Sequence, residues 1–205
     1  MFQPGDLVPN GTTYPENIVR DGKFTVSAKQ FRSHILPITN LYHPQVNDVI
    51  LVKAVYITGD FIKCIIISSD NDKKTKHSLY CHLLSLSFYN VTKRNKPKIE
   101  TNELLLVRIV KITNSFILVS AKEEWLGQTN KLIEKYELEL TENESSKEGK
   151  HKLLMFLSPI AVMNIFMTGL EIQNTFACVG MNGAVLLWGK KVQQAKEKLL
   201  KEYVQ

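Results

Sequence analysis

Short runs rich in valine and isoleucine, separated by turn residues, constrain the fold of this chain more than any other feature. Each run has the length of a β-strand. The clearest runs are Val49–Ile57, Phe61–Ile67, Leu104–Ile112 and Ser115–Ser120. Residues that favour turns lie between them, as in Thr58-Gly59-Asp60. Four or five such strands within about 80 residues predict a small closed β-barrel of the oligonucleotide-binding (OB) type.

The chain divides into three predicted units. Residues 1–43 are expected to form a small N-terminal β domain that opens with the turn Pro4-Gly5-Asp6. Residues 44–121 contain the predicted barrel, and residues 122–205 are expected to form an α+β domain. We therefore predict a mostly β fold with a C-terminal α+β domain.

The last unit alternates helix and strand signals. Ser158 as the N-cap and Pro159 in the first turn predict a helix that ends near Gly169. The other elements expected here are strands at Thr175–Val179 and Ala184–Trp188 and a terminal helix from about Lys190 to Tyr203. The stretch Asn130–Leu140 is compatible with either a helix or a strand, and we favour a strand over Tyr136–Leu140.

The chain is basic, with a formal charge of +6 and a pI of about 9.1. The excess lies in the middle third: residues 44–121 carry 11 basic and 6 acidic side chains, whereas residues 122–205 carry 11 of each. Seven Lys or Arg residues and no acid occur between Lys73 and Ile99. Such a run neutralises phosphate groups without discriminating between bases, so it favours sequence-tolerant, salt-sensitive binding of nucleic acid.

The candidate RNA-binding residues fall into two groups. The first, expected to contact phosphates, is Lys93, Arg94, Lys96 and Lys98, and the second and weaker group is Lys73, Lys74 and Lys76. Phe88, Tyr89 and Tyr80 lie in the same segment and are candidates to stack on unpaired bases. The alternative is a solvated loop without a ligand. The run of charges alone supports this alternative as well as it supports nucleic-acid binding.

A tight turn, Gly180-Met181-Asn182-Gly183, is predicted between the last two strands. Gly-x-x-Gly loops allow a backbone to approach a sugar-phosphate chain closely, as in KH domains. The basic residues that follow this turn are only Lys190 and Lys191. We therefore expect the turn to serve packing rather than RNA contact.

The sequence carries no motif for catalysis, a cofactor or a metal. Signatures such as GxSxG, the P-loop and HExxH are missing. His77, Cys81 and His82 form the only close Cys/His group, and no fourth ligand accompanies them. The apolar stretch Leu153–Leu170 is interrupted by polar residues, Pro and Gly, which indicates a buried element rather than a membrane span. We expect a non-enzymatic intracellular protein without cofactor, metal or membrane contact.

Two motifs resemble the RNA-binding cap subunits of the eukaryotic RNA exosome. Residues 86–99, LSFYNVTKRNKPKI, resemble the stretch in which the family's SF pair precedes ATKRNRPN. Residues 179–188, VGMNGAVLLW, followed by Gln193-Gln194, resemble its GMNGRIWV…QQ segment. The order of an N-terminal β domain, an S1-type OB barrel and a KH-type domain also matches the family. Two departures are Asn47 where the family has Gly, and Ala184 where it has a basic residue.

The resemblance implies a function and a set of partners. A cap subunit of this family is not an enzyme. It would stabilise a ring of RNase-PH-like subunits together with the other cap subunits. It would guide single-stranded RNA to an associated exoribonuclease for RNA degradation and processing, including that of ribosomal RNA, in the nucleus, the nucleolus and the cytoplasm. Two alternatives stay open: a free-standing S1/KH RNA-binding protein, and an architectural subunit whose basic loop contacts an acidic protein.

Overall fold

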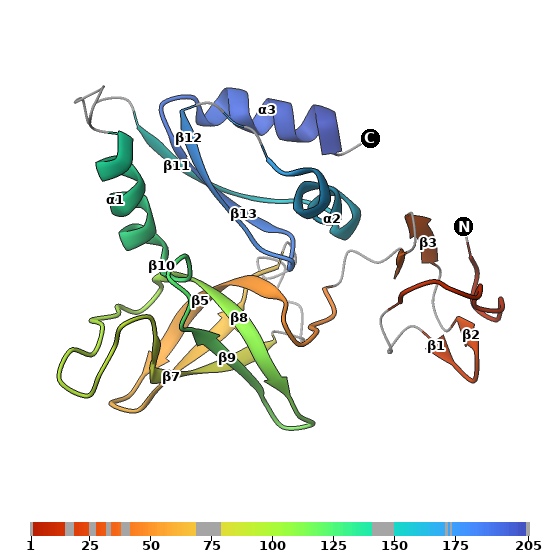
Figure 1. Cartoon of the computed structure of the whole chain (residues 1–205), viewed down its shortest axis with the longest axis horizontal. Coiled ribbons are helices and arrows are strands. Elements are labelled where there is room, and N and C mark those ends of the chain that lie inside the picture. Colours follow the sequence, from red (N-terminus) through yellow and green to blue (C-terminus); the bar gives the residue numbers. More distant parts are fainter. Residues whose placement is uncertain are drawn as a thin grey trace.

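A β-barrel and a C-terminal unit make up most of the part of the chain that this computed structural model describes (Figure 1). The described residues are 2–14, 19–24, 28–31, 34–37, 42–68, 79–140, 150–170, 172 and 174–203. They form mainly β-strands, together with three α-helices in the last third of the chain. The expected fold class is confirmed at this level.

Five strands close into the barrel. They are β5 (Val49–Ile57), β6 (Phe61–Ile66), β7 (Tyr80–Phe88), β8 (Leu104–Ile112) and β9 (Ile117–Ala121). β5 pairs with β6 and β8, β6 with β7, and β8 with β9, all antiparallel, whereas β7 and β9 run parallel. This ring of pairings fits an OB-type barrel. The runs predicted for β5 and β8 are confirmed residue for residue.

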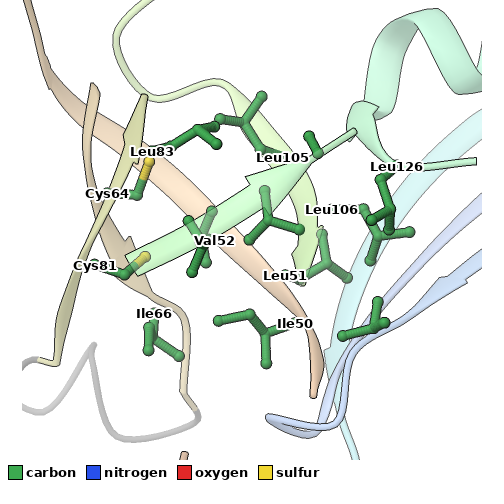
Figure 2. Packing of buried hydrophobic residues seen from close by; sticks show 14 of the residues in the cluster. Ile50, Leu51, Val52, Cys64, Ile66, Cys81, Leu83, Leu105, Leu106 and Leu126 are labelled. Atoms are coloured by element: carbon green, nitrogen blue, oxygen red, sulfur yellow. The ribbon is translucent and has the colours of Figure 1, made fainter. Parts of the chain in front are cut away.

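Alternating side chains fill the barrel (Figure 2). Along β6, Ile62, Cys64 and Ile66 are buried inside, and the residues between them are more exposed on the outer surface. β5 departs from this pattern, because all four residues of Val49–Val52 are buried. One side of this stretch faces the barrel interior, and the C-terminal unit covers the other.

The C-terminal unit follows the barrel through β10 (Gly127–Gln128), which pairs with β8. Its elements are α1 (Thr129–Leu140), β11 (His151–Phe156), α2 (Pro159–Thr168), β12 (Thr175–Val179), β13 (Ala184–Gly189) and α3 (Val192–Tyr203). The three strands form an antiparallel sheet in the order β11-β13-β12. The Ser158 side chain accepts a hydrogen bond from the Ala161 N–H, and Pro stands in the first turn, so the predicted start of α2 is confirmed.

Both faces of this sheet are buried, which explains the unbroken apolar run of β13. Val185 and Leu187 share a buried cluster with side chains of α2 and α3. Ala184 and Leu186 belong instead to the cluster that fills the barrel. The sheet therefore packs between the two helices and the barrel.

The strand expected over Tyr136–Leu140 is wrong, because these residues belong to helix α1. Leu132, Ile133 and Tyr136 recur at spacings of three and four, so they form one stripe along a helix. Ile133 is buried, and the Tyr136 ring packs on Phe176 with the ring centroids 5.2 Å apart. The Glu, Lys and Leu residues at most other positions are good helix formers.

The N-terminal segment contains two short hairpins. β1 (Val19–Arg20) pairs with β2 (Lys23–Phe24), and β3 (Ala28–Phe31) pairs with β4 (His34–Pro37). Phe24, Ala28 and Ile35 form a small buried cluster.

Tyr42 anchors the chain where it enters the barrel. Its side chain packs against the barrel core, and its hydroxyl donates to Asp48 Oδ2 at 2.5 Å. The same carboxylate oxygen accepts a hydrogen bond from the Gln45 N–H at 3.0 Å. Burial raises the pKa of Tyr42 and also the pKa of Asp48, although the two hydrogen bonds oppose the rise at Asp48.

Candidate nucleic-acid interface

Three rings stack on the outer surface of the barrel: Phe61 at the start of β6, His82 on β7 and Phe116 just before β9. The centroids of Phe61 and His82 are 5.6 Å apart with the ring planes at 22°. Those of His82 and Phe116 are 6.3 Å apart with the planes at 14°. We call these three residues the aromatic ladder. Side-chain rings of this kind offer faces on which unpaired bases stack.

Two matching turns hold the two phenylalanines. In the β5–β6 turn, the Thr58 hydroxyl donates to the Phe61 C=O at 2.8 Å and accepts from the Phe61 N–H at 3.0 Å. In the β8–β9 turn, Thr113 makes the same two bonds with Phe116, at 2.9 and 3.0 Å. Each Thr-x-x-Phe turn thus fixes one ring at the end of a hairpin.

The aromatic ladder lies on the part of the barrel that OB folds use for binding. In such folds the face of the second and third strands, together with the loops after the first and fourth strands, binds oligonucleotides. Here these elements are β6, β7 and the two Thr-x-x-Phe turns. The three rings therefore span the surface where an oligonucleotide is expected.

Lys63 adds a cation beside the ladder. It lies opposite His82 in the β6–β7 register, and its Nζ is 4.4 Å from the centroid of the Tyr80 ring. Tyr80 is 44% exposed. An exposed ring next to a cation can both stack on a base and attract a phosphate.

The loop between β7 and β8, residues 89–103, is a defined structure that we call the basic loop. Its four predicted phosphate ligands, Lys93, Arg94, Lys96 and Lys98, are all exposed. Asn95 organises the loop: its side-chain oxygen accepts hydrogen bonds from the N–H and the hydroxyl of Thr92. Its amide nitrogen donates to the Asn90 C=O at 3.0 Å. The basic side chains therefore project from an ordered turn.

Both ends of the basic loop are attached to the barrel. Val91 and Ile99 pack against the barrel core. Gln128 of β10 donates to the Lys98 C=O at 2.8 Å and to Glu103 Oε1 at 2.9 Å. These contacts fix the position of the loop relative to the strands.

Lys96 connects the basic loop to the aromatic ladder. Its Nζ donates to the Gly59 C=O at 2.6 Å and is 3.8 Å from Asp60 Oδ1. Gly59 and Asp60 belong to the turn that ends at Phe61. The basic loop thus lies beside the first ring of the ladder.

The other predicted phosphate ligands differ from Lys96. Within the described part of the chain, Lys93, Arg94 and Lys98 have no acidic partner, so their charges are available to phosphates. The second predicted group, Lys73, Lys74 and Lys76, lies outside the described residues.

The expectation that Phe88 stacks on bases is wrong. Its side chain is only 8% exposed and belongs to the barrel core. It closes β7 at an inward-facing position, where an apolar ring is more stable than in water. Tyr80 and Tyr89 are 44% and 46% exposed, so their rings are accessible.

The side chain of Asn182, in the Gly180–Gly183 turn, is buried against β5. Its amide oxygen accepts from the Leu51 N–H at 3.0 Å. Its amide nitrogen donates to the Leu51 C=O at 2.8 Å and to the Ile67 C=O at 2.7 Å. All polar groups of this side chain are therefore used to join the sheet to the barrel.

The backbone of the same turn is also in contact with β5. The Met181 N–H donates to the Val49 C=O at 2.7 Å. A Cβ added to Gly180 would lie 2.7 Å from the Leu51 nitrogen, so this position requires Gly. The turn faces the protein interior at these residues, and not a surface that a sugar-phosphate chain can reach.

Cys81 and His82 cannot bind one metal ion, because they lie on opposite sides of β7. Cys81 is buried inside the barrel, whereas His82 belongs to the aromatic ladder. His77 lies outside the described residues. Across the described ranges, no group of three or more His, Cys, Asp or Glu residues is placed to hold a metal ion. None of the helices in those ranges is long and apolar enough to cross a membrane.

The three cysteines are free and buried. Burial raises the pKa of Cys178 to about 12. The pKa of Cys81 is also raised, by its contact with Cys64 and by burial. A thiol with a raised pKa is a poor nucleophile, so these positions do not favour cysteine catalysis.

Phe61, His82 and Phe116 are absent from the site predicted from the sequence. A signal for two of them exists, because each Phe stands three residues after a Thr at a predicted hairpin turn. No sequence motif marks His82. Its place on the outer surface follows only once β7 is known to be a strand, because side chains alternate between the two sides of a strand.

No protein-family model matches this chain, and no curated protein matches it. One solved structure that is similar to it is described, provisionally, as an exosome complex RNA-binding protein. The two share 15% sequence identity with a TM-score of 0.43, over 72% of this chain and 75% of that chain. A likeness this low does not establish a common function.

Proposed function

We propose that this chain binds single-stranded RNA on the outer surface of β6, β7 and the two Thr-x-x-Phe turns. The observation that carries this proposal is the aromatic ladder of Phe61, His82 and Phe116. Base–aromatic stacking contributes about 1–3 kcal/mol per base and accepts any base. Binding is therefore tolerant of sequence and requires unpaired bases.

The basic loop supplies the phosphate contacts in this proposal. Lys93, Arg94 and Lys98 are exposed and lie in the loop that Lys96 attaches to the turn of Phe61. An RNA strand whose bases stack on the ladder would carry its phosphates past these cations. Because each phosphate contact releases counterions, affinity falls as salt rises.

We further propose that the chain is a cap subunit of an RNA exosome, most like the type called exosome component three, with the component-four type second. It would not be an enzyme. It would stabilise the RNase-PH-like ring with the other cap subunits and guide RNA to a separate exoribonuclease. Its place of action would be the nucleus, including the nucleolus, and the cytoplasm.

The two resembling motifs support this assignment because each contains an asparagine with a clear structural purpose. Asn95, in the TKRN motif, holds the basic loop in shape. Asn182, in the GMNG motif, joins the sheet of the C-terminal unit to β5. A KH-type assignment of that unit belongs to the same proposal, and rests on its β-α-β-β-α order from β11 to α3.

The cap assignment is tested by purifying the tagged full chain from its own cells, with nuclease treatment, and identifying the bound proteins by mass spectrometry. The assignment predicts RNase-PH-like subunits in near-equal amounts. The variant with Lys93, Arg94, Lys96 and Lys98 changed to Ala should retain them, because ring contacts do not require RNA. Recovery of the chain alone would instead favour the free-standing RNA-binding protein. Ring recovery combined with no RNA affinity would favour the architectural subunit.

A further inference from the structure

The free edge of strand β12 lies at the bottom of a groove. The sheet order β11-β13-β12 leaves β12 paired on one side only. A groove of about 690 Å³ runs along the strand and is lined by all five of its residues, Thr175–Val179. Consecutive residues of a strand point their side chains to opposite faces of the sheet. Because all of them line the groove, the groove runs along the edge of the strand and not over one face of the sheet.

The two walls of the groove come from opposite faces of the sheet. On the face that carries Phe176, helix α1 contributes Leu132 and Tyr136. On the other face, Phe166 of α2 and the segment after it contribute the second wall. The edge of β12 is thus recessed between two projecting walls.

The register of the sheet shows which backbone groups point into the groove. The Gly180 N–H donates to the Ala184 C=O, so these two residues form a hydrogen-bonded pair of the hairpin. Hydrogen-bonded and non-hydrogen-bonded pairs alternate in an antiparallel ladder. The N–H and C=O groups of Ala177 and Val179, which pair with Leu187 and Val185, therefore point away from β13.

These outward groups have no hydrogen-bond partner within the described part of the chain. Two residues after Val179, the N–H of Met181 points to the same side, and it donates to the Val49 C=O of β5. β5 thus provides at Met181 the kind of bond that an added strand would provide at Ala177 and Val179. An exposed edge of this kind is a template for an additional strand.

The charge of the groove limits what can occupy it. Among the described residues that line it, the charged ones are Glu124 and Lys135, and they form an ion pair at 2.5 Å. The strand itself, TFACV, is uncharged. The opposite edge of the sheet differs, because β11 begins with exposed His151 and Lys152, which discourage strand addition. A neutral groove is complementary to an uncharged apolar segment.

The aromatic side chains of the walls favour an apolar partner as well. Trp125 and Phe166 are 49% and 48% exposed, although both are large apolar side chains. Such residues supply most of the binding energy where a partner covers them. The walls also exclude a second copy of this sheet, because an edge recessed between helices cannot reach another edge that is recessed in the same way.

We infer that this groove binds an extended, uncharged segment of a partner protein, which adds to β12 as a fourth strand of the sheet. Main-chain hydrogen bonds to Ala177 and Val179 give the affinity, and the walls select apolar side chains. The residues that line this groove include none of the aromatic ladder. The inference therefore goes beyond the proposed RNA binding and does not depend on it.

The test uses a displayed library of random linear peptides of about nine residues, long enough to extend beyond β12 at both ends. The library is selected on the full chain, and the strongest peptide is synthesised with a fluorescent label. Its affinity is then measured for the wild type and for variants. We expect selected peptides with an uncharged, alternating apolar centre.

Two variants alter the groove, and two matched variants act as controls. Ala177→Pro removes a donor that points into the groove and no bond of the β12–β13 ladder, and Phe166→Glu places a charge on a wall. Each should weaken peptide binding at least tenfold. Lys152→Pro makes the same backbone change on the free edge of β11. Met167→Glu changes the neighbouring exposed residue, which does not line the groove. Both controls should bind the peptide as the wild type does.

Amide hydrogen exchange keeps the test independent of any one variant. Bound peptide should slow exchange at Ala177 and Val179 in the wild-type chain. The inference is overturned if no peptide is selected above background, if the bound peptide is helical, or if exchange at these amides is unchanged. It is also overturned if the wild type dimerises and Ala177→Pro makes it monomeric, because the occupant would then be a second copy. RNA affinity should be the same in Ala177→Pro and wild type, so failure here is separable from failure of the proposed function.

Discussion

Asn182 and Leu51, which are 131 residues apart in the chain, are joined by two hydrogen bonds through one buried side-chain amide. The N–H and the C=O of Leu51 are both satisfied by this amide, and a third bond goes to Ile67. Leu51 lies on β5 of the barrel, and Asn182 lies in the hairpin of the C-terminal unit. The two parts of the fold are thus held together by a specific polar contact in addition to apolar packing.

Replacing Asn182 with Ala should lower the free energy of unfolding by about 3 kcal/mol, because it leaves two buried backbone groups, the Leu51 N–H and the Ile67 C=O, without a partner. Urea denaturation followed by circular dichroism measures this change. The control is Asn114→Ala, at an exposed position of the β8–β9 turn, which should change stability by less than about 0.5 kcal/mol. Equal stabilities of the two variants would contradict the structural role of Asn182.

Replacing Gly180 with Ala should destabilise the chain by about 2 kcal/mol or more, because the added methyl group meets the backbone of β5. The matched variant is Gly59→Ala, where an added Cβ has nothing within 4 Å. That change should be nearly neutral. Thermal unfolding of both variants gives the comparison, and a Gly180→Ala protein as stable as Gly59→Ala would show that the turn does not pack against β5.

Replacing Lys93, Arg94, Lys96 and Lys98 with Ala should weaken RNA binding and flatten its salt dependence. On single strands, each lost phosphate contact reduces the slope of log affinity against log salt by about 0.7. Titrations of a labelled single-stranded RNA at several salt concentrations measure the slope. A control with the same charge change, at the exposed residues Lys131, Lys191, Lys198 and Lys201, should keep most of the slope. Identical slopes for the wild type and the basic-loop variant would remove these residues from the interface.

The buried carboxyl of Asp48 should make stability depend on pH. Its pKa is raised in the folded chain, so the folded state holds this proton to higher pH than the unfolded state, whose Asp pKa is about 3.9. The contribution of Asp48 to the free energy of unfolding is therefore full below that pH, and it is lost as pH rises through the folded pKa. Asp48→Asn keeps an acceptor for Tyr42 and Gln45 and removes the titration. Urea denaturation at several pH values from below the unfolded-state pKa upward measures the free energy of unfolding of both proteins. As pH rises, this free energy should fall in the wild type relative to Asp48→Asn. The same pH dependence in the two proteins would contradict the prediction.

The barrel was accessible to sequence reasoning because its strands are short, β-branched and bounded by turns. Leu104–Ile112 is an example, since its expected and observed bounds coincide. Tyr136–Leu140 shows the limit of this reasoning. Its helical spacing becomes apparent only together with Leu132 and Ile133, and tertiary packing of Tyr136 on Phe176 stabilises the helix. A short segment taken alone does not distinguish the two periods.

The candidate site was accessible only in part, for a different reason. Charge is visible in a sequence, so the basic loop stands out. A stack of rings is not, because Phe61, His82 and Phe116 come from three separate elements and meet only through strand pairing. Phe88 is a residue that the sequence suggests for the site but that does not belong to it. It stands next to the basic run in the sequence, yet its ring lies inside the barrel.

The aromatic ladder is tested most directly by the affinity of a labelled single-stranded RNA for Phe61→Ala and Phe116→Ala, measured by fluorescence anisotropy. Each change should weaken binding at least about tenfold, because a base loses its stacking partner, and should leave the salt slope unchanged. Phe166→Ala, at a Phe on α2 whose exposure is close to that of Phe116, is the matched control and should bind as the wild type does. Affinities of Phe61→Ala and Phe116→Ala within about twofold of the wild type, with both proteins folded, would contradict RNA binding on this face of the barrel.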